Sequence, residues 1–168
     1  MIKLAISMPP DGGLAATLLK QCGIEYAVGG ISMAPVSGGD RESQPWSLRS
    51  LERSRKAYEE NGFKLAVIES RPPMESIKLG LPGRDEEIDV IRTLLKNMGA
   101  AGIPTWCSMW MPILGVMRTS RTVPSRGGAL VSAFEEDAVE GTQETEYGVV
   151  TEEDQWENLR YFLEGVVP

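Results

Sequence analysis

Apolar residues along this chain form short continuous runs that alternate with stretches where they recur at helical spacing. Short apolar runs are typical of buried parallel strands, and apolar residues three or four positions apart are typical of one helix face. The pattern predicts strands at residues 2–6, 24–28, 63–68 and 103–107. It predicts helices that begin at Leu14, near Ser47, near Asp85 and at Thr151.

Local signals define the second helix well. Ser47 is a candidate N-cap, and Trp46 before it can pack on Leu51 as a hydrophobic staple. The helix should end at Asn61, because Gly62 adopts the left-handed cap conformation without strain.

The third and fourth helices carry signals in their first turns. Asp85, Glu86 and Glu87 lie where the positive end of the helix dipole favours carboxylates. Thr151 and Asp154 approximate a capping box. The apolar stripes are Leu14, Leu18, Leu19 and Cys22 in the first helix, Ile88, Ile91, Leu95 and Met98 in the third, and Trp156, Leu159, Leu163 and Val166 in the fourth.

One joint recurs three times: a helix ends, a glycine follows, and an apolar strand begins, at Gly23, Gly62 and Gly102. Repeated strand–helix units imply a parallel α/β sheet, either open and doubly wound or part of a (β/α)8 TIM barrel. Four units are half of a barrel that typically takes about 250 residues. The chain ends at residue 168, where a fifth strand should begin. We therefore expect residues 1–168 to be the N-terminal half of a barrel, truncated before strand five.

Composition narrows the possible functions. The 168 residues carry 17 Lys and Arg against 24 Asp and Glu, a net charge of −7, which argues against nucleic-acid and anionic-membrane partners. There is no histidine, so a Ser-His-Asp triad and a His-ligated metal site are excluded. The two cysteines lack zinc or disulfide spacing, and no apolar run is long enough to span a bilayer. The expected setting is cytoplasmic.

The loops after the strands should carry the site, since they gather at the carboxyl edge of a parallel sheet. Glycine pairs after the first two strands do not extend to a nucleotide-binding motif. Glu69 follows the third strand directly, with Arg71 and Lys78 beyond it. These three charges either face the mouth of the barrel or form ordinary ion pairs on its rim.

A long insertion follows the fourth strand, with more than 40 residues before the next helix. Insertions of this length are usually functional lids or disordered. Arg118, Arg121 and Arg126 cluster in it, in a chain that is otherwise acidic. A guanidinium group pairs bidentately with a carboxylate, which favours a small acidic substrate. A solvated basic turn explains the same spacing equally well.

Seven segments in the second half of the chain carry a resemblance to a known family, in collinear order: residues 67–70, 77–85, 100–107, 110–112, 118–120, 126–130 and 156–163. In these segments the chain resembles the mannonate dehydratase family, whose fold is similar to xylose-isomerase-like barrels. Residues 1–63 match mainly in their strand–helix pattern. Where the family commonly has Tyr-Asn after the strand-four cysteine, this chain has Ser108-Met109. Cys107 is expected to pack in the core rather than bind a metal.

The resemblance implies a hydro-lyase that removes water from D-mannonate to give 2-keto-3-deoxy-D-gluconate in hexuronate catabolism, with Mn²⁺ or Fe²⁺ as cofactor. The family's metal ligands, two His, a Cys and an Asp, lie in the second half of the barrel, so this chain alone is expected to lack them and to be inactive. No catalytic residue is assigned. The residues expected near the aldonate substrate are Arg118 as carboxylate partner, Glu69 and Lys78 as polar positioning groups, and Trp110 as a wall of the pocket.

Two alternatives remain open from the residues. One is a sugar isomerase or epimerase on the same barrel, because a fold alone does not fix the reaction. The other is a non-catalytic half-barrel, whose two open sheet edges would invite homo-oligomerisation or aggregation.

Overall fold

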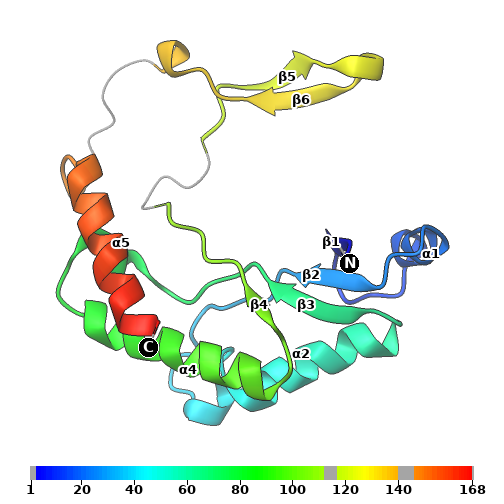
Figure 1. Cartoon of the computed structure of the whole chain (residues 1–168), viewed down its shortest axis with the longest axis horizontal. Coiled ribbons are helices and arrows are strands. Elements are labelled where there is room, and N and C mark those ends of the chain that lie inside the picture. The colour runs from blue at the N-terminus through cyan, green and yellow to red at the C-terminus, as the bar shows by residue number, and fades with distance from the viewer. Residues whose placement is uncertain (1–2, 112–116, 140–145, 168) are drawn as a thin grey trace.

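The chain folds into a parallel four-stranded sheet with helices packed on one side of it, as a computed structural model of residues 3–111, 117–139 and 146–167 describes (Figure 1). The strands of this sheet are β1 (Ala5–Ser7), β2 (Tyr26–Gly29), β3 (Lys64–Ile68) and β4 (Thr105–Trp106). The α-helices are α1 (Leu14–Gln21), α2 (Leu48–Glu60), α3 (Glu75–Leu79), α4 (Arg84–Ala100) and α5 (Glu152–Val166). A separate hairpin consists of β5 (Ser120–Pro124) and β6 (Leu130–Ala133). Short 3-10 helices are η1 (Arg41–Ser43), η2 (Arg126–Gly128) and η3 (Glu136–Ala138).

The strand order is β1-β2-β3-β4, and every pairing is parallel. A doubly wound sheet reverses its strand order part-way across, whereas a barrel wall keeps the order of the sequence. The observed order is therefore that of a barrel wall. The predicted α/β class with four strand–helix units is confirmed.

The helix ends follow the local signals in the sequence. Ser47 caps α2 by accepting a hydrogen bond from the Ser50 amide, and Gly62 after the helix has φ +77°. Thr151 and Asp154 form a complete capping box on α5. These predictions are confirmed, because each depends on a few neighbouring residues and not on the tertiary contacts.

The apolar core has two parts. Apolar side chains between the sheet and helices α2 and α4 form the first, which includes Leu51, Tyr58, Phe63, Leu65 and Ile68. The second lies under α5 and contains Met74, Ile77, Ile88, Ile91 and Phe162. Figure 1 shows α2 and α4 along one side of the sheet, with α5 crossing the end of α4.

Some helix faces differ in part from the predicted stripes. In α4 the predicted Ile88, Ile91 and Met98 are buried, but the fourth buried position is Leu94 and not Leu95, which is only partly buried. In α5 the buried residues are Asn158 and Phe162, while Trp156 and Leu163 are exposed. The predicted stripe on α5 is half right, since Leu159 and Val166 pack against the core. Asn158 takes an inward position because its amide binds a backbone carbonyl of α3, which apolar spacing cannot reveal.

The sheet edges also differ from expectation. The first strand is β1 at Ala5–Ser7, displaced from the predicted 2–6, and all three of its residues are exposed instead of buried. The fourth strand is only two residues long, so Cys107 falls beyond it and is exposed, not part of the core. Ile2, Pro168 and parts of the insertion after β4 (112–116 and 140–145) lie outside the described residues.

Candidate functional site

The carboxyl ends of the parallel strands meet at one edge of the sheet. Backbone bonds fix this edge: the Met8 amide donates to the Val28 carbonyl at 3.3 Å, and the Cys107 amide donates to the Ile68 carbonyl at 2.8 Å. The Glu69 amide donates to the carbonyl of Gly29 at 3.1 Å. Glu69 is thus held directly after β3, with an exposed side chain, as its position in the sequence predicted.

Lys78 lies on α3, a helix of five residues in a stretch that the sequence predicts as the loop after the third strand. Its side chain is 0% exposed, although it ends in an ammonium group. The Lys78 Nζ lies 3.2 Å from Glu75 Oε1 and 3.1 Å from the Met111 carbonyl oxygen. A buried ammonium group requires such partners, because its loss of hydration is otherwise very unfavourable.

A second cation shares the same carboxylate. Arg71 Nη2 lies 3.4 Å from Glu75 Oε1, so the two cations contact one oxygen. Burial lowers the pKa of Lys78, and the nearby Arg71 lowers this pKa further, against the opposing effects of Glu75 and Glu87. Glu75 is the residue of this cluster that the sequence analysis missed, although its helical spacing between Arg71 and Lys78 carried a signal.

Trp110 lies in the loop after β4. Its ring stacks on Phe162 of α5 with centroids 5.5 Å apart, and its indole Nε1 is buried without a hydrogen-bond acceptor among the described residues. Trp106, at the end of β4, packs edge-on against Phe162 at 6.5 Å and donates to the carbonyl of Ser70 at 3.0 Å. The two tryptophans and Phe162 therefore join the loops after β3 and β4 to α5.

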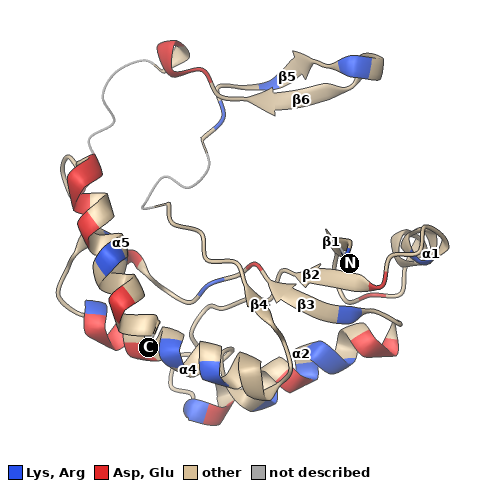
Figure 2. Cartoon of the chain, in the orientation of Figure 1, with Lys and Arg blue, Asp and Glu red and all other residues tan. Residues whose placement is uncertain are grey.

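Arg118 lies just before the hairpin β5–β6. It is exposed, and its guanidinium group donates to Ser132 Oγ at 3.2 Å and to the Met117 carbonyl at 2.8 Å. Arg121 and Arg126 lie on the same hairpin and are also exposed. The segment 117–134 contains three arginines and no acidic residue, and Figure 2 shows Lys and Arg colour but no Asp or Glu colour on this hairpin.

The structure brings two of the four predicted site residues together. Lys78 binds the carbonyl of Met111, the neighbour of Trp110. Glu69 lies on the same edge of the sheet, but no described hydrogen bond or ion pair joins its carboxylate to this cluster. Arg118 is held by the hairpin, and no described contact joins it to the other three.

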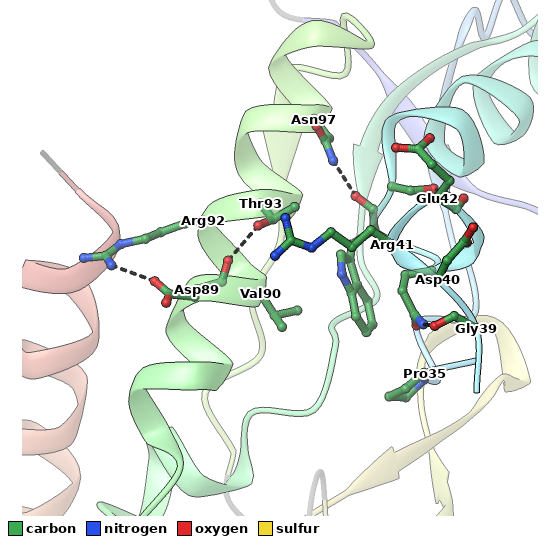
Figure 3. Close-up of a pocket in the computed structure, with 13 residues that line it drawn as sticks. Pro35, Gly39, Asp40, Arg41, Glu42, Asp89, Val90, Arg92, Thr93 and Asn97 are labelled. Atoms are coloured by element: carbon green, nitrogen blue, oxygen red, sulfur yellow. Dashed lines mark hydrogen bonds and ion pairs between the residues drawn. The ribbon is translucent and has the colours of Figure 1, made fainter. Parts of the chain in front are cut away.

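A separate pocket of about 770 Å³ lies between η1 and α4, on the helical side of the molecule (Figure 3). Arg41, Trp46, Asp89 and Arg92 are among its lining residues, and none of the four predicted site residues is. Asp40 at its rim accepts hydrogen bonds from Ser43, which lower the pKa of this carboxyl group. Both acidic and basic side chains line the pocket.

No group of three or more His, Cys, Asp or Glu side chains within the described ranges could hold a metal ion. The donor set that a catalytic Mn²⁺ or Fe²⁺ requires is therefore not found in this part of the chain. None of the described helices is long and apolar enough to cross a membrane.

Comparison with known proteins identifies the family. A family model for D-mannonate dehydratase matches residues 13–147. The chain belongs to the mannonate dehydratase family. Its relatives include the mannonate dehydratase of Streptococcus pneumoniae (strain 70585), 32% identical over 149 residues, which covers 74% of this chain and 41% of the relative. Another is the mannonate dehydratase of Geobacillus thermodenitrificans (strain NG80-2), 30% identical, which covers 87% of this chain and 46% of the relative.

A solved structure agrees with this assignment. The crystal structure of mannonate dehydratase from Streptococcus suis serotype2 superimposes with a TM-score of 0.80 at 28% sequence identity, covering 100% of this chain and 50% of that one. The chain thus spans about half the length of the relatives it matches. The predicted resemblance is confirmed, and so is the fold class, an α/β half of a (β/α)8 barrel.

Proposed function

We propose that this chain provides the N-terminal half of a mannonate dehydratase, a hydro-lyase that converts D-mannonate to 2-keto-3-deoxy-D-gluconate in hexuronate catabolism. The observation that supports this most is the family match over residues 13–147 together with the collinear fold of the Streptococcus suis relative. The expected location is the cytoplasm, where this sugar acid is metabolised.

The reaction has simple requirements. A base removes the proton on the carbon next to the carboxylate, the hydroxyl group on the following carbon leaves as water, and the resulting enol becomes the 2-keto acid. The substrate carboxylate needs a cationic partner throughout, because removal of the neighbouring proton builds further negative charge beside it.

In this proposal the four residues keep the roles expected from the sequence. Arg118 pairs with the carboxylate, Trp110 forms a wall, and Glu69 and Lys78 are polar positioning groups. Arg118 supports this role because its guanidinium group is exposed and has no carboxylate partner among the described residues. The proposal places the Mn²⁺ or Fe²⁺ ligands in the half of the family's fold that this chain does not match, so no step is assigned to a metal on these residues.

The test compares three samples. The 168-residue chain with Mn²⁺ should not turn over D-mannonate, whereas the chain mixed with, or fused to, the C-terminal half of the Streptococcus suis relative should release a 2-keto-3-deoxy acid. The fusion with Arg118→Ala should lose most of its kcat/KM, and the fusion with Arg160→Ala, an exposed arginine on α5, should not. Normal kcat/KM in the Arg118→Ala fusion would refute the role of Arg118.

Mass spectrometry of the product separates the dehydratase from an isomerase. A dehydratase product is lighter than the substrate by one water, and an isomerase product has the same mass. The departure at Ser108-Met109, where Ser108 is exposed at the strand end, is the feature that makes this comparison necessary.

A further inference from the structure

Lys78 is the one charged residue with a fully buried side chain in the part of the chain described here. Its ammonium group donates to Glu75 Oε1 at 3.2 Å and to the Met111 carbonyl at 3.1 Å. Glu75 is on the same helix, one turn earlier, so the bond between Lys78 and Glu75 is local to α3. The bond to Met111 crosses 33 positions of sequence and reaches the loop after β4.

The backbone of Lys78 makes a second set of long-range bonds. Its carbonyl oxygen accepts hydrogen bonds from Gln155 Nε2 and Asn158 Nδ2, both at 3.0 Å. Asn158 is one of the buried polar residues, and both partners lie on α5. One residue of α3 thus binds α5 through its carbonyl group and the loop after β4 through its side chain.

The neighbouring Trp110 has a ring contact but no described hydrogen bond of its own. Its ring stacks on Phe162 at 5.5 Å, but its indole Nε1 makes no described hydrogen bond. A ring contact is less directional than a hydrogen bond, so the bond to the Met111 carbonyl restrains the backbone beside Trp110 more closely. The Lys78–Met111 bond is a polar contact one residue along the chain from Trp110.

We propose that Lys78 is a positioning residue, which holds the loop after β4 through the Met111 carbonyl and thereby fixes Trp110 at the carboxyl edge of the sheet. This rests on the proposed function only in assigning that edge to the substrate. It specifies how Lys78 acts: through a backbone carbonyl and a neighbouring aromatic ring, and not by touching the sugar acid.

The charge of Lys78 makes the arrangement sensitive to pH. The charged or titratable groups that act on it are Glu75 and Arg71 beside it and Glu87 on α4, whose Oε2 accepts from the Ile77 amide. The groups from α5 and from the loop after β4 are neutral amides and a carbonyl. Burial lowers the pKa of Lys78 below its ordinary 10.5, so loss of its proton on raising the pH should weaken the bond to Met111.

The first experiment measures hydrogen exchange on the 168-residue chain. In Lys78→Met, amides of residues 107–111 should exchange about tenfold faster or more, because a charged hydrogen bond to that loop is lost. Exchange in α2 should not change. Lys78→Arg keeps the charge and the donors and should restore most of the protection, and Lys96→Met on the exposed face of α4 is the matched control.

The second experiment follows Trp110 itself. The difference in emission between the wild type and Trp110→Phe should shift at a pH below the ordinary lysine pKa of 10.5, and Lys78→Met should lack this transition. The wild-type titration needs no variant at Lys78, so it remains decisive if Lys78→Met does not fold. Unchanged exchange in Lys78→Met, or a wild-type Trp110 signal with no such transition, overturns the proposal.

These readouts require no substrate. If Lys78→Met loosens the loop but the fused enzyme never acts on mannonate, the positioning role stands and the proposed function is refuted. If the fused enzyme turns over mannonate normally but the loop stays rigid in Lys78→Met, the proposed function stands and the positioning role is refuted.

Discussion

Replacement of Phe162 with alanine is expected to destabilise the chain by about 3 kcal/mol. Phe162 is 2% exposed and lies in the core cluster under α5. Truncation of a buried phenylalanine costs about 3–5 kcal/mol, and this includes the loss of aromatic pairs worth about 0.5–1.5 kcal/mol each. Phe162 makes two such pairs, with Trp106 and Trp110. We expect the lower end of the range because Trp110 is only partly buried and can move into the space.

Urea unfolding followed by far-UV circular dichroism measures this difference, provided that the dependence on urea is the same in both proteins. The control is Leu163→Ala, at the next position of α5, whose side chain is 45% exposed and should lose less than about 1 kcal/mol. If Phe162→Ala loses no more stability than Leu163→Ala, the packing of α5 described above is wrong.

Three further predictions concern capping, pH and the sheet edge. Ser47→Ala should cost about 1 kcal/mol in urea unfolding, because its buried hydroxyl caps α2. Hydrogen bonds from Thr151 lower the pKa of Asp154 below its ordinary 3.8. The stabilisation that the Asp154 carboxylate gives to α5 is therefore present above pH 3.8 and is lost as pH falls through the lowered pKa. Circular dichroism from about pH 5 to about pH 2 should show this loss in the wild type and not in Asp154→Asn. The chain should self-associate through the exposed β1 edge. Leu4→Glu with Ile6→Glu, exposed residues just before and within β1, should shift sedimentation towards the monomer. A wild type that is already monomeric would contradict this.

Much of the fold could be predicted because its signals are local. Ser47 and the Thr151–Asp154 pair determine helix starts through bonds to residues three positions away. Gly62 determines a helix end through its own backbone conformation. Strand polarity followed from the alternation of strands and helices, since that connection permits only parallel neighbours in one sheet.

The buried face of α5 could be predicted only in part, at Leu159 and Val166. Apolar spacing favoured Trp156 and Leu163 as inward residues, but both are exposed and Asn158 is buried. Asn158 turns inward because its amide binds the carbonyl of Lys78, a contact over 80 positions of sequence. A pattern rule that assigns polar residues to the surface cannot find an inward asparagine whose partner lies on a helix of five residues.

The candidate site, too, could be predicted where it depends on local sequence and not where it depends on tertiary contacts. The position of Glu69 could be predicted, because a residue directly after a parallel strand lies at the edge of the sheet. The burial of Lys78 could not, because it depends on α3, the loop after β4 and α5 meeting at one point. Glu75 could have been found from the helical spacing Arg71–Glu75–Lys78, had residues 75–79 been taken as a helix.

The buried polar residues indicate a place in this fold where the side chains present are not those that would give the greatest stability. Of the four buried polar residues in the described part of the chain, Ser47 and Ser50 belong to the cap of α2, which stabilises that helix. The other two, Lys78 and Asn158, meet each other under the loop after β4. Well-packed apolar residues there would be as stable or more so, because a buried charge loses its hydration. A chain under selection for stability alone has no reason to keep an ammonium group at this point, whereas a chain that must hold one loop at the carboxyl edge of its sheet does.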